Sequence, residues 1–187
     1  MRRRTALYAA VPVALVLALL IGVLATRKSA SDVGGSKSIV GRTVPHVAGT
    51  TIDGQRFDIG QYQGKWVLVN FFASWCAPCE KENPEIKAWA TEHRQAGDGE
   101  VVMLVFGDDP VHARRFFATH GGDWPVVIDR TDDAFSLRFG VTQPPESYLV
   151  APNGVVAAKW AGAITQRDLD QVMDQVNAAA NRTAASS

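Results

Sequence analysis

The sequence predicts an α/β fold, a mixed β-sheet flanked by helices. Apolar runs typical of buried strands alternate with segments in which apolar residues recur every three or four positions, as on one face of a helix. Turn signals at Asp53-Gly54 and Pro152-Asn153-Gly154 indicate antiparallel strand pairs within this pattern. The chain has 187 residues, and the ~150 residues that follow the first 35 suit one domain with a sizeable core.

Each element has its own local signal. A hairpin is expected around the turn at 53–54, and the mostly apolar runs at 66–72, 101–106 and 126–128 predict buried strands. Apolar residues at helical spacing predict a helix after residue 76, with Ile86, Trp89, Ala90 and His93 on one face, and another over residues 110–120, with Ala113, Phe116, Phe117 and His120 on one side. A helical turn around 133–139 precedes strands at 146–150 and 155–160. The last helix, from about Thr165, carries Leu169, Val172, Met173 and Val176 at relative positions 0, 3, 4 and 7.

The N-terminal region is expected to reach or cross a membrane. Residues 6–25 are 20 consecutive uncharged, mostly apolar positions after three arginines, and as a helix they would span about 30 Å, the thickness of a bilayer core. We therefore expect residues 1–28 to be an uncleaved membrane anchor, with a cleaved export signal as the alternative. Residues 29–38 read as a flexible linker, 39–176 as the folded domain and 177–187 as a disordered tail.

Charge is divided unevenly along the chain. The whole chain is neutral, but five of its 19 basic residues and one of its 19 acidic residues precede residue 36, which leaves 14 basic against 18 acidic residues and a net charge of −4 for the remainder. This net charge does not suggest nucleic-acid binding.

The two cysteines of the chain, Cys76 and Cys79, stand where the apolar run 66–72 leads into a helix. A C-x-x-C pair in this context is typical of a redox site. Two cysteines at this spacing can form a disulfide, and the first thiol faces the unpaired N–H groups at the helix start, which stabilise a thiolate. Pro78 favours a helix start at this point. We therefore expect Cys76 to be the nucleophile and Cys79 to resolve the mixed disulfide.

Two other interpretations of the pair are weaker. A zinc site would need two more ligands, and the four histidines have no H-x(3–5)-H spacing. A purely structural disulfide is possible in an exported protein, but so short a loop constrains the unfolded chain little and would stabilise the fold weakly.

Three segments carry a family resemblance. Residues 67–79 read Val-Leu-Val-Asn-Phe-Phe-Ala-Ser-Trp-Cys-Ala-Pro-Cys and are soon followed by Glu82. Residues 140–150 read Gly-Val-Thr-Gln-Pro-Pro-Glu-Ser-Tyr-Leu-Val, and Trp160-Ala-Gly162 comes later. Over roughly residues 40–176 the chain resembles the membrane-anchored thioredoxin-like proteins called TlpA, ResA and CcmG (DsbE).

The resemblance implies a thioredoxin-like fold with an N-terminal β-hairpin and a central strand–helix insertion. It implies an extracytoplasmic enzyme, on a single-pass membrane anchor, that needs no cofactor or metal. Its substrates would be disulfide-containing exported proteins, notably the C-x-x-C haem site of apocytochrome c in cytochrome c biogenesis. A membrane electron donor of the CcdA or DsbD type would then reduce the protein again.

The resemblance also assigns site residues. It makes Glu82 a third catalytic residue, which assists proton transfer at Cys79, and it makes Pro145 the family's cis-proline. Substrate binding is expected at Trp75, Pro144, Pro145 and Glu146. Asn70 stands where cytoplasmic thioredoxins carry a buried acid, Phe72 replaces a more usual Trp, and Gln143 and Pro144 replace small residues before the cis-proline.

Other functions remain as alternatives. The same chemistry run in reverse would make the protein an oxidant that donates its disulfide to secreted proteins, as a DsbE/DsbF-like enzyme does, because direction depends on reduction potential and partner access. A peroxidase is disfavoured, since Ala73 lies where peroxiredoxins need a Thr. A haem- or peptide-binding module with a dormant disulfide would lack insulin-reducing activity.

Overall fold

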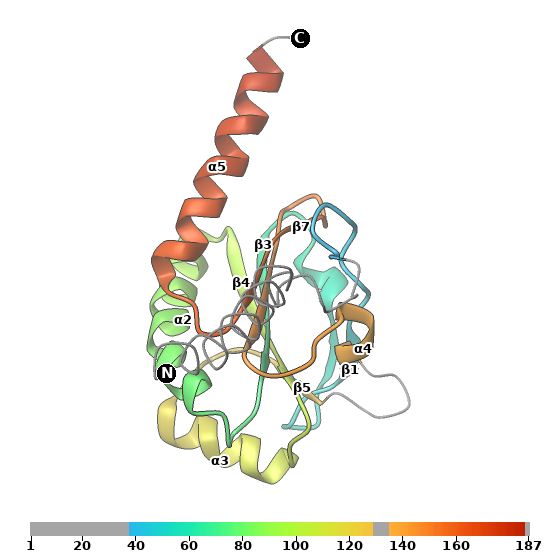
Figure 1. Cartoon of the computed structure of the whole chain (residues 1–187), viewed down its shortest axis with the longest axis vertical. Coiled ribbons are helices and arrows are strands. Elements are labelled where there is room, and N and C mark those ends of the chain that lie inside the picture. The colour runs from blue at the N-terminus through green and yellow to red at the C-terminus, as the bar shows by residue number, and fades with distance from the viewer. Residues whose placement is uncertain (1–37, 129–134, 186–187) are drawn as a thin grey trace, which may run out of the picture. The chain divides into compact units, whose positions relative to one another are not determined.

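A five-stranded mixed sheet forms the centre of the structure, a computed structural model that describes residues 38–128 and 135–185 (Figure 1). The strand order is β5–β4–β3–β6–β7. Strands β3, β4 and β5 run parallel, whereas β6 is antiparallel to β3 and β7 is antiparallel to β6. The strands are β3 (Trp66–Phe72), β4 (Gly99–Val105), β5 (Val126–Ile128), β6 (Glu146–Val150) and β7 (Val156–Ala161).

A separate two-stranded hairpin precedes the sheet. Strands β1 (Ala48–Thr50) and β2 (Arg56–Asp58) pair antiparallel, and a short 3-10 helix η2 (Ile59–Tyr62) leads toward β3. The hairpin expected at Asp53-Gly54 is therefore confirmed, and Gly54 adopts the positive φ of 81° that such a turn favours.

Helices cover both faces of the sheet. Helices α2 (Ala77–Ala96), α3 (Pro110–His120) and α5 (Gln166–Ala185) lie on one side, while the hairpin and α4 (Phe135–Phe139) lie on the other (Figure 1). The predicted α/β class with a mixed sheet flanked by helices is confirmed. Between the cysteines and the second half of the sheet the chain forms β4, α3, β5 and α4, which includes the additional strand and helix expected there.

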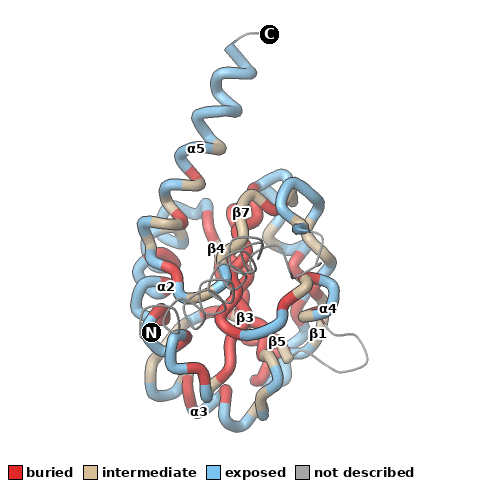
Figure 2. Tube along the Cα trace, in the orientation of Figure 1, coloured by how far each residue is buried: buried red, intermediate tan, exposed pale blue. Residues whose placement is uncertain are grey.

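The central strand β3 is buried along its whole length and separates two hydrophobic cores (Figure 2). Its alternate residues Trp66, Leu68 and Phe72 pack with Trp89 of α2 and other residues of that side. The intervening residues Val67, Val69 and Phe71 pack on the opposite face, with Phe139 and Tyr148. Since side chains alternate along a strand, every other residue of β3 faces the helix that carries the cysteines.

The C-terminal helix differs from its expected length. Residues 177–185, expected to belong to a disordered tail, continue α5 as exposed helical turns that project from the domain (Figures 1 and 2). The physical reason is the alanine content of this segment, because alanine has the highest helix propensity and needs no tertiary contact to favour the helix. The last residues, 186–187, lie outside the described part.

The expected membrane segment and almost all of the expected linker, residues 1–37, lie outside the described residues, as do residues 129–134. None of the helices in the described part of the chain is long and apolar enough to cross a membrane.

Candidate active site

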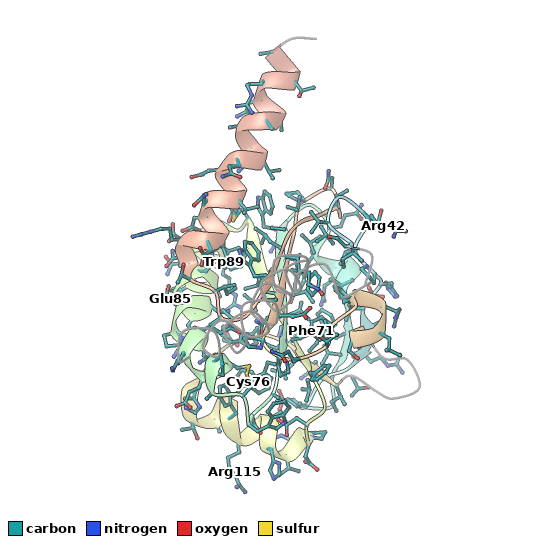
Figure 3. All side chains as sticks on the ribbon, in the orientation of Figure 1. Arg42, Phe71, Cys76, Glu85, Trp89 and Arg115 are labelled. Carbon is teal, nitrogen blue, oxygen red and sulfur yellow. A yellow bond between two sulfur atoms is a disulfide. The ribbon has the colours of Figure 1, made fainter. Side chains whose placement is uncertain are left out.

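Strand β3 and helix α2 position the two cysteines. Cys76 and Cys79 form a disulfide at the start of α2, with their Cα atoms 5.3 Å apart (Figure 3). Cys76 is the N-cap of α2, and its Sγ accepts the backbone N–H of Cys79 at 3.2 Å. Pro78 lies in the first turn, where its missing N–H would have no intrahelical partner. This confirms the expected placement of the pair at a helix N-terminus.

Both cysteines are nearly enclosed. Cys76 is 4 % exposed and Cys79 is 3 % exposed in this disulfide form. Burial therefore does not tell the nucleophile from the resolving cysteine. Cys76 has the stronger case because, as N-cap, its sulfur already accepts a helix N–H and lies at the positive end of the helix dipole.

Glu82 lies one helical turn beyond Cys79 and is buried inside the protein, with 2 % of its surface exposed. Its Oε1 accepts a hydrogen bond from Asn70 Nδ2 at 2.8 Å, and its Oε2 accepts the backbone N–H of Ile164 at 3.0 Å. Burial raises the pKa of Glu82 to about 7, against the opposing effect of these two hydrogen bonds. A carboxyl with such a pKa can both accept and release a proton near neutral pH.

Two residues of this buried cluster are not predicted as site residues by the sequence. Asn70, on β3, binds Glu82, and Ser147, on β6, binds Asn70. Asn70 Nδ2 also donates to Ser147 Oγ at 2.9 Å. The alternation along β3 could have indicated that Asn70 faces α2, but no sequence signal connects it to Ser147, 77 residues away.

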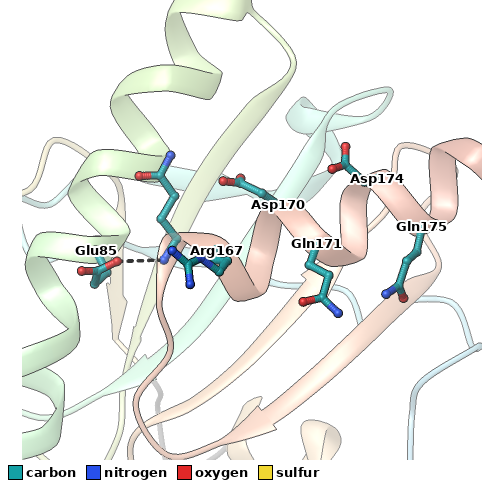
Figure 4. A pocket seen from close by; sticks show the side chains of 7 residues that line it. Glu85, Arg167, Asp170, Gln171, Asp174 and Gln175 are labelled. Atoms are coloured by element: carbon teal, nitrogen blue, oxygen red, sulfur yellow. Dashed lines mark hydrogen bonds between the residues drawn. The ribbon is translucent and has the colours of Figure 1, made fainter.

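The turn that leads into α5 docks on α2 through two carboxylates. Glu82 holds the backbone of Ile164, and Glu85, one turn further along α2, accepts the backbone N–H of Gln166 at 3.0 Å (Figure 4). Glu85 therefore satisfies one of the unpaired N–H groups at the start of α5. Residues 164–166 are thus held against α2 at two points, Glu82 and Glu85.

The two prolines adjoin the end of β3. The peptide bond between Pro144 and Pro145 is cis, and the Pro145 carbonyl accepts the N–H of Gly162 at 2.9 Å. Phe71, near the end of β3, pairs with Glu146, the first residue of β6, and Glu146 directly follows Pro145. The loop therefore lies next to the chain that leads to Cys76. Both prolines are buried.

Trp75 is a large apolar residue that lies exposed in this region. It is 61 % exposed, and its Nε1 donates to the Gly107 carbonyl at 3.4 Å. An exposed tryptophan directly before Cys76 offers a large apolar surface to an incoming substrate.

Glu146 is not positioned for the expected substrate contact. It is 4 % exposed and shares a face of β6 with Tyr148, the face opposite that of Ser147, so it points away from α2 and the cysteines. Its Oε2 accepts from the Tyr148 hydroxyl at 2.9 Å and forms an ion pair with Lys159 at 2.9 Å. The physical reason is the two-residue period of a strand, which places the first residue of β6 in the far core.

The disulfide at the start of α2 can accept two electrons by thiol–disulfide exchange, and the buried Glu82 one turn away can take up the proton that the exchange releases. This chemistry is that of a thiol–disulfide oxidoreductase. The model of the Redoxin family matches residues 39–178. The chain belongs to the Redoxin family.

Curated relatives have similar sequences. The chain is 29 % identical over 137 residues to the thiol-disulfide oxidoreductase ResA of Geobacillus thermodenitrificans, which covers 73 % of this chain and 78 % of the relative. It is also 29 % identical over 143 residues to ResA of Bacillus subtilis, with 76 % and 79 % covered.

Solved structures share the fold. A thiol:disulfide interchange protein of the thioredoxin family from Chlorobium tepidum matches with a TM-score of 0.63 and 24 % identity, over 71 % of this chain and 94 % of that one. MTB DsbF, in mixed oxidised and reduced forms, matches with a TM-score of 0.62 and 27 % identity, over 71 % and 98 %. The expected thioredoxin-like fold is confirmed.

Proposed function

We propose that this oxidoreductase reduces disulfides of exported proteins outside the cytoplasm, held at the membrane by residues 6–25. The C-x-x-C site of apocytochrome c is the proposed substrate, and a membrane protein of the CcdA or DsbD type is the proposed electron donor. The observation that carries the exchange chemistry is the buried Glu82, one turn from Cys79, because disulfide exchange by a dithiol requires each thiol to lose its proton in turn. The similarity to ResA supports the reducing direction.

The reaction begins with the reduced protein. The thiolate of Cys76 attacks one sulfur of the substrate disulfide, a bond forms between the two sulfurs, and the other substrate sulfur leaves as a thiolate that takes a proton. Cys79, as a thiolate, then attacks the Cys76 sulfur. The mixed disulfide breaks, the second substrate thiolate leaves and is protonated, and the Cys76–Cys79 disulfide remains. Two electrons have passed to the substrate.

Glu82 serves the second step. The thiol of Cys79 must lose its proton in an enclosed site, where burial disfavours a free thiolate. A carboxylate that titrates near pH 7 accepts this proton without being a strong base, and it returns the proton when the protein is reduced again.

The opposite direction is the second candidate, favoured by the similarity to MTB DsbF. In that case the Cys76–Cys79 disulfide would accept two electrons from a pair of thiols in a secreted protein. The geometry of the site serves both directions, because thiol–disulfide exchange is reversible.

Trapping the redox state in cells tests the direction. Cells are acidified to stop exchange, and free thiols are then alkylated with a reagent that shifts the mass of the protein. We expect the pair to be mostly reduced at steady state, and to become oxidised when the membrane donor is deleted. A pair that stays oxidised in wild-type cells supports the oxidant and contradicts the reductant.

Protease treatment tests the location. Protease added to spheroplasts should digest the domain, since the proposed anchor holds it outside. A soluble cytoplasmic pool after fractionation contradicts the proposed location.

A further inference from the structure

We propose that Asn70 and Ser147 form a buried relay that orients Glu82 and sets its charge, which makes both of them positioning residues for disulfide exchange. The inference rests on the proposed role of Glu82.

Both N–H bonds of the Asn70 amide are in use. One donates to Glu82 Oε1 at 2.8 Å and the other to Ser147 Oγ at 2.9 Å. Asn70 and Ser147 are fully buried, at 0 % exposure. A hydrogen bond from a neutral donor to a carboxylate favours the charged form, and in an enclosed site no water competes for it.

The other end of the amide is unpartnered. Among the described residues, Asn70 Oδ1 is buried without any hydrogen-bond partner. A buried acceptor such as Asn70 Oδ1 destabilises the fold when no donor pairs with it. Protonated Glu82 has a hydroxyl group that could be this donor.

The amide can therefore serve both states of Glu82. With the carboxylate, Nδ2 faces Glu82, as observed. With the carboxylic acid, a half-turn of the amide would bring Oδ1 to accept the Glu82 hydroxyl, at the cost of moving the two N–H groups to the place where Oδ1 now has no partner. The amide therefore favours the carboxylate. Ser147 permits the half-turn, because its hydroxyl accepts from Nδ2 in the first state and can donate to Oδ1 in the second.

Few other charges act on this carboxyl. The other charged residues on the elements around it are exposed or half-buried, or lie on the far face of the sheet. They include Glu80, Lys81, Glu85 and Lys87 on α2, Arg167, Asp168 and Asp170 on α5, and Glu146 on β6, which shares the far face with Tyr148. Glu85 is bound to Gln166, and Asp168 is bound to Thr165. The cysteine pair and the Asn70 amide are thus the groups best placed to change the charge of Glu82.

Removing the Asn70 amide should shift the pKa of Glu82. Asn70→Leu leaves the Glu82 carboxylate without its side-chain partner, so its pKa should rise by about one to two units. Ser147→Ala removes the second partner of the Asn70 amide and leaves the amide free to turn. This variant should raise the pKa of Glu82 by a smaller amount. The measurement is a carbon-13 NMR titration of the Glu82 carboxyl in the full chain, purified in detergent with the disulfide intact. The pH–rate profile of exchange by the reduced protein should move with it.

A double-mutant cycle separates the relay from general damage. In a Glu82→Gln background, Asn70→Leu should no longer move the pH–rate midpoint, since the titrating group is gone. Asn83→Leu is the matched control, because Asn83 is also a buried asparagine with an unpartnered Oδ1, but it donates to the carbonyls of His120 and Gly121. It should leave the Glu82 titration where it is.

The outcomes distinguish the relay from the proposed function. If the wild-type protein exchanges disulfides but its Glu82 titration is unmoved by both Asn70→Leu and Ser147→Ala, or is moved equally by Asn83→Leu, the relay is wrong. If the wild type exchanges no disulfides, the proposed function fails instead. Ser147→Ala removes a single oxygen, so it keeps the test decisive even where Asn70→Leu does not fold.

Discussion

Glu82 Oε2 accepts the backbone N–H of Ile164 at 3.0 Å, across 82 residues of sequence. The proposed proton carrier of the site is therefore also a structural partner of the turn before α5. The protonation of this one carboxyl should consequently be visible in stability as well as in catalysis.

The stability of the folded protein should fall between pH 4.5 and pH 7 through Glu82. The pKa of Glu82 is raised from 4.5 to about 7 in the folded state. Below pH 4.5 Glu82 is protonated in both the folded and the unfolded protein. As the pH rises toward 7, Glu82 loses its proton in the unfolded chain but keeps it in the folded protein, which favours unfolding. The resulting loss is at most about 3 kcal/mol, complete above pH 7.

Comparison with a neutral variant isolates this effect. The free energy of unfolding of oxidised wild type and oxidised Glu82→Gln, measured in denaturant at a series of pH values, should diverge over this range, with the wild type losing stability. Gln at 82 can keep the bond from Ile164, and the unpartnered Asn70 Oδ1 can accept from its amide. Parallel curves for the two proteins would contradict the raised pKa.

Replacing each cysteine in turn should give variants that differ in the mixed disulfides they accumulate. Cys79→Ala should accumulate mixed disulfides between Cys76 and substrate, because the attack on the substrate still occurs but resolution does not. Cys76→Ala should accumulate none. Non-reducing gels after incubation with a disulfide peptide measure both, and faster iodoacetamide labelling of Cys79 than of Cys76 in the reduced wild type would reverse the assignment.

Pro144 should limit backbone pairing with substrate. Proline has no N–H, so residue 144 cannot donate to an extended substrate segment, and a bond worth about 0.5–1.5 kcal/mol is missing. Pro144→Ala should restore this donor and lower KM for disulfide peptides up to about tenfold, or broaden the range of peptides accepted. Steady-state kinetics over a peptide panel test this, and an unchanged KM for every peptide would rule out a docking role for residue 144.

Lys159 should be a stability residue rather than a catalytic one. Its Nζ lies 2.9 Å from Oε2 of the buried Glu146, and burial raises the pKa of Tyr148, whose hydroxyl donates to the same carboxylate. Lys159→Met leaves that carboxylate without its cation and should cost about 3 kcal/mol of unfolding free energy.

A second variant checks the reason for that loss. Lys159→Met combined with Glu146→Gln removes both charges and should recover much of the stability in denaturant unfolding. Equal losses in the single and double variants would mean that the ion pair is not what Lys159 contributes.

The sequence by itself determined the local features of this protein. The apolar run at 66–72, the cysteine pair and Pro78 were sufficient to predict a buried strand that enters a helix at Cys76, because strand burial and helix starts depend on neighbouring residues. The bounds of β3, α3, β5 and β6 follow from the same kind of signal. Helical spacing likewise put Glu82 one turn beyond Cys79.

Only the tertiary structure decided what surrounds these residues. Glu82 draws its partners from β3 and from the turn before α5, and Asn70 reaches Ser147 on β6, through contacts 12 to 82 residues apart. The register of β6 against β3 pairs Glu146 with Phe71. The Glu146 side chain therefore lies in the hydrophobic core on the face of the sheet opposite α2, although Glu146 directly follows the cis-proline. Sequence spacing tells which residues of one element share a face, whereas the order and register of the strands decide what that face meets.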